Sequence, residues 1–418
     1  MELEQSKHAL PGLKEKRLQQ KKDILTFFYK QGRLSKPEIC RMTNMTAPTI
    51  NRIINELIET RWVVDCGEGI SVGGKRPHLF CLNPDAAYVL GVDLGRVHLK
   101  IALFNLHREV IGKIHTFPSM LERASNQENL TYLQEKTREV IIRSGVPRDR
   151  VKVAGVAVPG LIDKEGNSYT YLMFENSSLK KELERLLGMP VLLDHDSNVM
   201  SIAEHTFGAA KGSSNALCIS VSECIGMGMI LNGKPYSGAL GMAGEFGHIR
   251  LSGVDLPCYC GKTGCLESVA SGRAIVTAAR EAIRDGKKTA IEACAAGEEV
   301  TLTHVITAAI QDDIFAIELL QRAGEKIGEG IATLVHLFNP QLLVIGGEIA
   351  GAGEHITAPV LQAVNKYTLS RLRSQCELRL STLNTRSVIM GTLMMVMQDL
   401  YYDGNSDFFQ LTMQFKGN

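Results

Sequence analysis

The residues best suited to do chemistry in this sequence lie just past its midpoint. Cys258, Cys260 and Cys265 fall within eight residues, and His248 stands ten residues before the first of them. Thiolate sulfur and imidazole nitrogen are the ligands that zinc prefers, and four of them complete a tetrahedral structural site. Glycines between the cysteines allow the backbone to turn tightly around an ion. The spacing therefore predicts one structural Zn2+ bound by these four side chains; three unrelated buried thiols are the alternative.

The same stretch carries a longer pattern, which reads G-x-A-G-E-x-G-H and then C-x-C-G-x-x-G-C-L-E. This pattern resembles the signature of the ROK family of repressors, open reading frames and sugar kinases, and the similarity extends over about residues 86–400. It implies an α/β protein with a two-lobed, actin-like fold of the sugar kinase and Hsp70 type. By this resemblance the four residues above bind zinc, and Glu245, His248 and Glu267 face a sugar.

Length and composition fit a protein of several domains. The chain has 418 residues, of which 44% are hydrophobic and 22% charged, enough for two or three domains with their own cores. It contains no run of eighteen apolar residues, and its first residues lack the order of a signal peptide. Ten cysteines are too sparse for a disulfide scaffold and, with the metal cluster, indicate a reducing cytosol. We therefore expect a cytoplasmic protein without membrane insertion.

The N-terminal part of the chain is basic. Residues 1–84 hold 14 Lys and Arg against 9 Asp and Glu, a net charge of +5, whereas the whole chain has a net charge of +1. The remainder is therefore slightly acidic, with 32 basic against 36 acidic residues. A small basic domain on a larger acidic one points to nucleic acid as a partner.

Helix signals in this basic part predict a winged helix-turn-helix. A helix is expected over residues 14–31, a second begins at Ser35 with Glu38 completing a capping box, and a third is capped by Thr46 with Pro48 in its first turn. Two strands joined by a glycine-rich tip follow, as in a wing, and the segment is similar to the G-G-x-R-P wing of ROK repressors. A helical protein–protein module is the alternative.

Six residues are expected to meet DNA. The exposed start of the third helix would reach base edges in the major groove, and the wing tip would contact phosphates or the minor groove. These residues are Ala47, Thr49, Asn51 and Arg52 on the helix and Lys75 and Arg76 on the wing.

The chain after residue 84 divides into two lobes of the implied fold. We expect a first lobe over residues 85–200 and a second lobe with the zinc site over residues 201–385. A helix over residues 386–402 would pack back on the first lobe, and residues 403–418 would form a tail.

The family's sugar-binding pattern is largely present. Pro159-Gly160 matches the sugar loop, and Asp196 matches the aspartate that removes the proton from the sugar hydroxyl in the kinases. Asn198 completes the same D-x-N pattern, but His195 stands where the kinases usually have asparagine. The resemblance therefore implies a sugar site formed by Gly160, Asp196, Asn198, Glu245, His248 and Glu267.

The two phosphate-binding loops of the kinases are altered. Arg96, Val97 and His98 follow Gly95 where the kinases have glycine and threonine, and the sequence Ser222-Glu223-Cys224 replaces a G-T-G. Glu223 would oppose phosphate by like-charge repulsion, and loss of glycine hinders close backbone approach.

These features favour a sugar-responsive transcriptional regulator, with a repressor as the expected type, over a ROK sugar kinase. We expect operator DNA and a sugar or sugar-phosphate effector as partners, and a homodimer or tetramer, because paired helix-turn-helix units bind pseudo-palindromes. No catalytic residue is expected, although Asp196 matches the kinase base. A zinc hydrolase would need an open metal position, which four protein ligands do not leave. A transporter protein as partner stays open.

Overall fold

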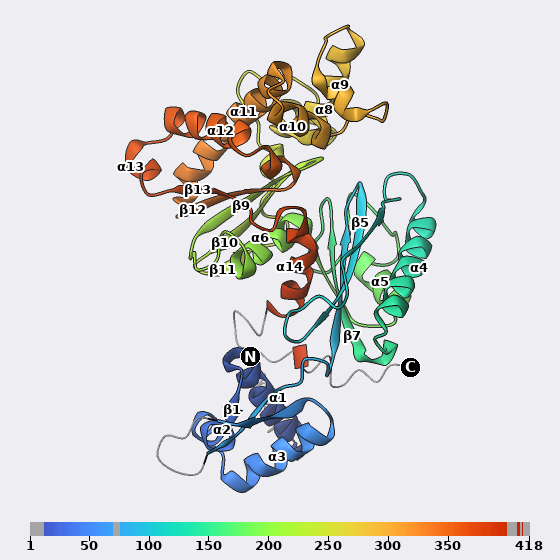
Figure 1. Cartoon of the computed structure of the whole chain (residues 1–418), viewed down its shortest axis with the longest axis vertical. Helices are drawn as coiled ribbons and strands as arrows, with labels where there is room; N and C mark the ends of the chain where they lie inside the picture. Colours follow the sequence, from blue (N-terminus) through green and yellow to red (C-terminus); the bar gives the residue numbers. More distant parts are fainter. Residues whose placement is uncertain (1–11, 70–75, 399–407, 410–411, 413–418) are drawn as a thin grey trace, which may run out of the picture.

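The computed structural model describes residues 12–69, 76–398, 408–409 and 412. A small N-terminal module lies below two larger lobes, and two helices lie between the lobes (Figure 1). The predicted architecture, a winged helix-turn-helix followed by an actin-like fold, is confirmed.

The N-terminal module combines three helices with a three-stranded antiparallel sheet of order β1-β3-β2. Its elements are α1 (Leu13–Gln31), β1 (Leu34–Ser35), α2 (Lys36–Thr43), α3 (Ala47–Glu59), β2 (Val63–Glu68) and β3 (His78–Leu82). The predicted capping box starts α2, where the Ser35 amide donates to the Glu38 carboxylate at 2.7 Å. At α3 the Thr46 hydroxyl contacts the Thr49 hydroxyl at 3.0 Å and makes no hydrogen bond to the helix backbone, so that expected cap bond is absent.

One face of α3 builds the core of this module. Ile50, Ile53, Ile54 and Leu57 are fully buried, as their helical spacing predicts. Ile58, in the last turn of α3, is 38% exposed.

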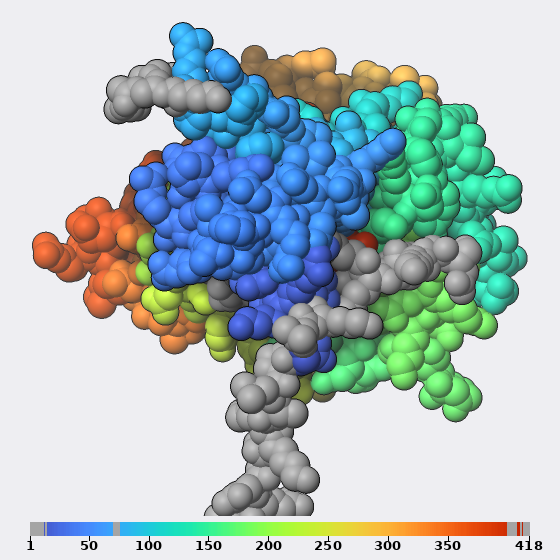
Figure 2. Space-filling model, turned by 90° about the horizontal axis from the view of Figure 1, so that it is seen from below, coloured from blue at the N-terminus to red at the C-terminus, as the bar shows by residue number. Residues whose placement is uncertain are grey.

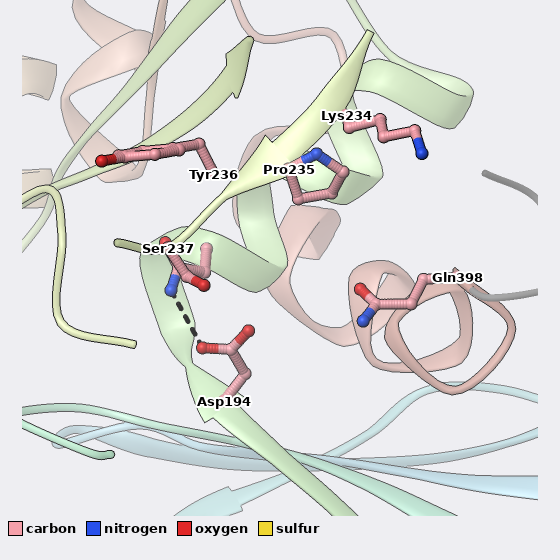
Figure 3. A pocket seen from close by; sticks show the side chains of 7 residues that line it. Asp194, Lys234, Pro235, Tyr236, Ser237 and Gln398 are labelled. Carbon is pink, nitrogen blue, oxygen red and sulfur yellow. Dashed lines mark hydrogen bonds between the residues drawn. The ribbon is translucent and has the colours of Figure 1, made fainter. Parts of the chain in front are cut away.

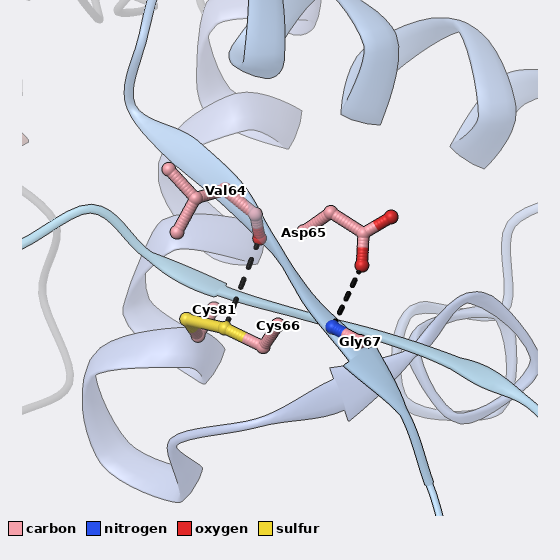
Figure 4. Close-up of a disulfide and its surroundings, with 5 residues drawn as sticks. All are labelled: Val64, Asp65, Cys66, Gly67 and Cys81. Carbon is pink, nitrogen blue, oxygen red and sulfur yellow. Dashed lines mark hydrogen bonds between the residues drawn. A yellow bond between two sulfur atoms is a disulfide. The ribbon is translucent and has the colours of Figure 1, made fainter.

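The two wing strands are joined by a disulfide between Cys66 and Cys81 (Figure 4). Val64 lies opposite Cys81 in the antiparallel register, so Cys66, two residues further along β2, projects from the same face. The ten cysteines were expected to form no disulfide scaffold, and in the described part of the chain this bond joins only the two neighbouring wing strands. Of the two wing-tip residues expected to contact DNA, Lys75 lies outside the described residues.

The opposite end of the chain completes the module's core. Phe408, Phe409 and Thr412 are buried, and the ring of Phe409 meets that of Trp62 edge-on at 5.8 Å. The two phenylalanine side chains belong to one apolar cluster with residues of α1 and α3. The segment expected to be a tail over residues 403–418 therefore contributes core residues to the N-terminal module.

The first lobe is built on a five-stranded sheet of order β6-β5-β4-β7-β8. Its strands are β4 (Tyr88–Leu94), β5 (His98–Asn105), β6 (His115–Pro118), β7 (Val151–Val158) and β8 (Val191–His195). β4 pairs antiparallel with β5 and parallel with β7, which pairs parallel with β8. Helices α4 (Asn126–Ser144) and α5 (Leu179–Leu187) belong to this lobe.

The second lobe repeats this plan with a sheet of order β11-β10-β9-β12-β13. Its strands are β9 (Ala216–Val221), β10 (Ile225–Leu231), β11 (Lys234–Tyr236), β12 (Leu342–Gly346) and β13 (Glu377–Leu380). Its helices are α7 (Glu267–Ala270), α8 (Gly272–Arg284), α9 (Ala290–Ala295), α10 (Leu302–Ile310), α11 (Ile314–Phe338), α12 (Glu354–Tyr367) and α13 (Ser370–Arg373). In both lobes a hairpin leads into parallel strands.

Helices α6 (Asp196–Phe207) and α14 (Ser387–Val396) cross between the lobes (Figure 1). A Cβ added to Gly391 of α14 would lie 2.1 Å from the Val199 carbonyl oxygen of α6, so glycine is needed for this close approach. The helix expected over residues 386–402 is observed as α14, which ends at Val396, and residues 399–402 lie outside the described part.

Candidate binding cleft and metal centre

A cavity of about 500 Å3 opens between the two lobes. The first lobe contributes the turn after β4, the loop after β7 and the start of α6; the second contributes the turn between β9 and β10 and the loop that follows β11. Ligands of open α/β sheets gather where strands end in this way. The cavity is within the size range of small-molecule sites.

Four of the six expected sugar-binding residues line this cavity: Gly160, Asp196, Glu245 and His248. Gly160 has φ = +83°, and a Cβ there would lie 2.6 Å from the Thr170 Cβ, so the loop requires glycine. Asp196 accepts a hydrogen bond from the Ser197 hydroxyl at 3.0 Å. Its neighbour His195, which stands where the kinases have asparagine, also lines the cavity, with Nε2 3.4 Å from an Asp196 oxygen.

Asn198 does not line this cavity. Its side-chain amide donates a hydrogen bond to Asp194 at 2.9 Å, and Asn198 lines a separate cavity of about 150 Å3. The reason is helical geometry: α6 begins at Asp196, and two residues along a helix turn the side chain by about 200° around its axis. Figure 3 shows Lys234, Pro235 and Gln398 around that smaller space.

Glu267 does not line the cavity either. Its side chain is 3% exposed, and one carboxylate oxygen accepts a hydrogen bond from the Ile225 amide at 2.7 Å. Burial raises the pKa of this carboxyl. Glu267 begins the short helix α7 and supports the start of β10 from behind, so it shapes the cleft without facing it.

A second buried carboxyl, Asp93, reaches the cleft at the end of β4. Burial raises its pKa to about 7; the Lys100 ammonium, 3.7 Å away, opposes this shift, and the Asp196 carboxylate adds to it. Burial therefore favours the protonated form of Asp93, in which the carboxyl can donate a hydrogen bond as well as accept one.

The four expected metal ligands come together beside the cleft. One ligand atom from each of His248, Cys258, Cys260 and Cys265 lies within 4.8 Å of all the others. Cys260 and Cys265 place their sulfur atoms 3.8 Å apart. Two thiolates at about 2.3 Å from one tetrahedral zinc would be separated by about 3.8 Å, so this donor set fits zinc.

The imidazole of His248 faces two ways. Its Nδ1 lies 3.7 Å from the Cys258 sulfur, on the metal side. Its Nε2 lies 3.3 Å from the Tyr259 hydroxyl and 4.0 Å from a Glu245 carboxylate oxygen, on the cleft side. The ring is therefore positioned to serve as a metal ligand and as a wall of the cavity.

The altered phosphate loops meet across the cleft. Arg96, in the turn after β4, places Nη1 2.6 Å from the Cys224 sulfur in the turn after β9. Its guanidinium also lies over the rings of Tyr171 and Tyr259, at 5.2 and 5.4 Å from their centroids. A side chain of the first lobe thus fills space where the kinase pattern has only backbone and a hydroxyl.

Glu223 does not stand alone in this region. Arg273 lies 3.4 Å from the Glu223 carboxylate and 3.5 Å from that of Glu122 in the other lobe. Glu122 in turn accepts a hydrogen bond from the Tyr171 hydroxyl at 2.8 Å. The repulsion that we expected from Glu223 is therefore partly offset, because a guanidinium neutralises it.

Sequence reasoning missed Tyr259, Arg273 and Glu122. The position of Tyr259 was predictable, because it lies between the metal ligands Cys258 and Cys260 in the sequence and must be close to them in space. The positions of Arg273 and Glu122 were not predictable, because neither belongs to a motif and they are brought together only by the packing of the lobes.

The N-terminal module presents α3 on the side that faces away from the lobes (Figure 1). Ala47, Asn51 and Arg52 are exposed there, and Thr49 is half-buried. Arg76 on the wing is exposed and lies 3.9 Å from Glu68. Seen from this side, the module's surface stands in front of the lobes, open to a large partner (Figure 2).

Glu56, on α3, ties this helix to α1. Its carboxylate pairs with Arg17 and, at 3.1 Å, with the Lys21 ammonium.

In the described part of the chain, no helix has the length and apolar character needed to cross a bilayer.

Two family models match the sequence. The ROK family model matches residues 89–399, and a winged helix-turn-helix DNA-binding model matches residues 17–64. The chain is 28% identical over 370 residues to a protein named xylose repressor from Caldicellulosiruptor bescii, covering 88% of this chain and 92% of that protein. It is 28% identical over 369 residues to the DNA-binding transcriptional dual regulator NagC of Escherichia coli K12, covering 86% and 87%.

Solved structures resemble the whole chain or its lobes. A ROK family transcriptional regulator described as a homolog of the E. coli Mlc protein aligns with a TM-score of 0.77 at 25% identity, covering 96% of this chain and 99% of that chain. A ROK family glucokinase from Streptomyces griseus, in complex with glucose and AMPPNP, aligns with a TM-score of 0.63 at 23% identity, covering 73% and 98%. At 23% identity, the similarity to the glucokinase is evidence about the fold of the lobes alone.

Proposed function

This chain belongs to the ROK family, and from that premise we propose that it regulates transcription in response to a sugar-type effector. The N-terminal module binds operator DNA, and the cleft between the lobes binds the effector. The observation that carries the proposal is a combination of features in one chain. An exposed helix of a winged helix-turn-helix occurs together with a cavity lined by groups that suit a sugar, and side chains fill the loops that bind phosphate in the kinases.

The DNA-binding part of the proposal rests on α3. Asn51 and Arg52 are exposed on the face turned away from the lobes, where they can reach base edges in the major groove. The exposed wing residue Arg76 is suited to a phosphate contact. The relatives named xylose repressor and DNA-binding transcriptional dual regulator align over both the module and the lobes, and they support this assignment.

The effector part rests on the mixture of groups in the cavity. Sugar hydroxyls both donate and accept hydrogen bonds, so carboxylates and an imidazole suit them. Asp196, Glu245 and His248 supply these groups, and Gly160 leaves room for a ligand to approach the backbone. The N-acetylglucosamine and xylose repressors among the relatives favour a carbohydrate as the effector class.

The competing function is that of a ROK sugar kinase, which the retained Asp196 favours. Phosphoryl transfer depends almost wholly on positioning the phosphates and stabilising their charge. Here Arg96 reaches Cys224 across the region where the kinase loops approach phosphate, and Glu223 replaces a glycine-rich backbone. A general base alone supplies roughly 10²–10⁴-fold in rate, so Asp196 without a nucleotide site serves better as an effector ligand.

The metal part of the proposal is one structural Zn2+ per chain. His248, Cys258, Cys260 and Cys265 hold it, and with four protein ligands it stabilises the loop and leaves no position for catalysis. The loop then holds His248 and Tyr259 at the cleft.

We further infer a population shift as the mechanism. Effector binding changes how far the lobes close, and α14, which packs between them and leads toward the N-terminal module, carries the change. Operator affinity changes if two modules are held at a fixed spacing, so the working form is a homodimer or tetramer. Operator DNA places the protein in the cytoplasm.

The test joins effector binding to DNA binding. Asp196→Ala should abolish the effect of the cognate sugar on operator affinity, measured by fluorescence anisotropy, while operator affinity without sugar stays unchanged. Asp149→Ala, an exposed aspartate of the same lobe, is the matched control and should behave as wild type. A sugar panel in thermal-shift format finds the effector, because a ligand of the folded state raises stability. Sugar phosphorylation with ATP at about 1–100 per second would establish the kinase instead.

A further inference from the structure

We propose that Cys66 and Cys81 form a reversible thiol–disulfide modification site, and that glutathione acts through this pair to control how tightly the N-terminal module binds DNA. This inference rests on the proposed function, because it assigns a second input to the same DNA-binding module. The site lies on the wing and uses no residue of the cleft between the lobes.

The bond stands apart from the chain's other cysteines. The remaining eight are free, and three of them are the proposed zinc ligands Cys258, Cys260 and Cys265. A zinc site holds its cysteines as thiolates, and the cytoplasm in which the proposed function places the protein keeps most thiols reduced. A disulfide in such surroundings is typically catalytic or redox-sensing rather than a permanent cross-link.

The pair projects from the outer face of the wing sheet. Along β3, Phe80 and Leu82 are buried in the module's apolar cluster, whereas Cys81 between them points to the opposite face, because successive side chains of a strand alternate. Both cysteines are half-buried, so a small thiol can approach the sulfur atoms from solvent. The module's core does not contain the bond and stays packed when the bond is reduced.

The backbone keeps the two cysteines together in either redox state. Cys81 pairs with Val64 in the β2–β3 ladder, and the Cα atoms of Cys66 and Cys81 lie 6.2 Å apart, within the range that a disulfide spans (Figure 4). The hydrogen bonds of this ladder do not depend on the sulfur atoms. Reduction therefore leaves two neighbouring thiols that can close the bond again.

The bond crosses the wing where the strand pairing is interrupted. The register of β2 against β3 shifts between Asp65 and Glu68, and Cys66 lies in this bulge. A bulge leaves one residue unpaired and disrupts the ladder locally. Beyond it, Glu68 pairs with His78. The disulfide thus supplies a covalent link at the point where backbone pairing is missing.

The bond also governs a residue expected to contact DNA. Arg76 is exposed and lies inside the loop that the bond closes, with its guanidinium 3.9 Å from the Glu68 carboxylate beyond the bulge. With the bond closed, this arm of the wing is held in one orientation, so binding DNA costs less ordering. The oxidised protein should therefore bind DNA about 3- to 10-fold more tightly than the reduced protein.

The exchange balances with glutathione disulfide as the oxidant. The thiolate of one cysteine attacks a sulfur of glutathione disulfide, which forms a mixed disulfide and releases one glutathione thiolate. The thiolate of the second cysteine attacks the protein sulfur of that mixed disulfide, which forms the intramolecular bond and releases the second glutathione thiolate. The two thiol protons of the protein pass to these thiolates, and two electrons reduce the oxidant. Two glutathione thiols reduce the bond by the same steps in reverse.

Titration of the full chain in glutathione buffers tests the inference. Ratios of reduced to oxidised glutathione run from about 1:1 to about 1000:1, and mass spectrometry after thiol alkylation measures the fraction of the Cys66–Cys81 bond at each ratio. Fluorescence anisotropy measures DNA binding with two probes, a duplex selected from a random-sequence library and an unselected random duplex. Metal content is measured on the same samples and should stay constant.

We expect the bond to open and close within this range of ratios. Both duplexes should bind more tightly when it is closed, because the wing contacts phosphate rather than bases. The salt slope should be larger by about 0.9 in the closed form, the value of one additional phosphate contact.

Variants separate the bond from the other cysteines. Cys81→Ser, and independently Cys66→Ser, should show the affinity and salt slope of the reduced protein at every ratio. Cys294→Ser removes a half-buried free thiol of the second lobe and, as the matched control, should respond as wild type does. Arg76→Ala should abolish the difference in salt slope between the two redox states. Thermal unfolding establishes that each variant is folded before titration.

Several results would overturn the inference. These are thiols that stay reduced at every ratio, a bond that glutathione does not reduce in the folded protein, a redox change that leaves DNA affinity and salt slope unaltered, or a redox effect that persists in Cys81→Ser. Redox-dependent DNA binding without a response to any sugar would support the inference and refute the effector part of the proposed function. A protein that binds neither duplex in either redox state would refute both.

Discussion

Phe409 is the sharpest place to perturb the link between the two ends of the chain. Its ring is fully buried in the N-terminal module and meets Trp62 edge-on at 5.8 Å. Replacing a buried phenylalanine by alanine costs about 3–5 kcal/mol in free energy of unfolding, because contacts are lost and a cavity remains. Edge-on aromatic pairing accounts for about 1 kcal/mol of that sum.

The N-terminal module is a small domain, and small domains have free energies of unfolding near the lower end of about 5–15 kcal/mol. For 60–100 residues, 1 kcal/mol shifts the unfolding midpoint by about 4–8 °C. Phe409→Ala should therefore lower the midpoint of the module by at least about 12 °C. Operator binding should be nearly normal at 10 °C and lost at 37 °C.

Trp62 makes this measurable, because it is the single tryptophan of the chain. Its fluorescence reports unfolding of the module, while far-ultraviolet circular dichroism is dominated by the lobes. Leu369→Ala is the control: this leucine is 67% exposed, and its removal should change stability by no more than about 0.5 kcal/mol. A Trp62 transition that moves by less than about 3 °C in Phe409→Ala would refute the idea that the distant segment completes this core.

Three further outcomes are expected. Cys265→Ser should release the metal, so that purified protein from zinc-replete medium contains less than half an equivalent by mass spectrometry, against about one in wild type. Arg76→Ala should weaken binding to all DNA sequences and lower the salt slope by about 0.9, whereas Arg52→Ala should relax sequence preference in a binding-site selection. The folded-state pKa of Asp93 is about 7, against an ordinary 3.8. Its contribution to folding stability is therefore fully present at low pH and is lost as pH rises through 7. The free energy of unfolding of Asp93→Asn, measured with urea, should therefore rise by about 2–3 kcal/mol relative to that of wild type between pH 5 and pH 8. The lost pairing with Lys100 adds an offset that is the same at both pH values.

Local patterns in the sequence predicted the elements well. The capping box at Ser35 and the start of the third helix after Thr46 both depend on residues a few positions apart. The metal cluster was predictable for the same reason, because three of its ligands fall within eight residues. Short-range chemistry of this kind is nearly independent of the rest of the fold.

Side-chain direction and long-range packing were not predictable in this way. Asn198 matches the D-x-N motif, but the motif does not show that α6 begins at Asp196. Because it does, the amide of Asn198 points away from the cleft. Arg273 and Glu122 meet only because the lobes do, and Phe409 joins the N-terminal core from the far end of the chain. The register that brings Cys66 beside Cys81 depends on the length of the wing, which composition does not reveal.

The two-sided imidazole of His248 has a consequence for how the molecule responds to its surroundings. One nitrogen faces the metal ligands and the other faces the cleft. Any ligand whose binding changes the electron density or orientation of that ring must change metal affinity, and by thermodynamic reciprocity the metal changes ligand affinity by the same factor. In the proposed regulator, loss of the metal would therefore change effector affinity by the factor by which the effector changes metal affinity.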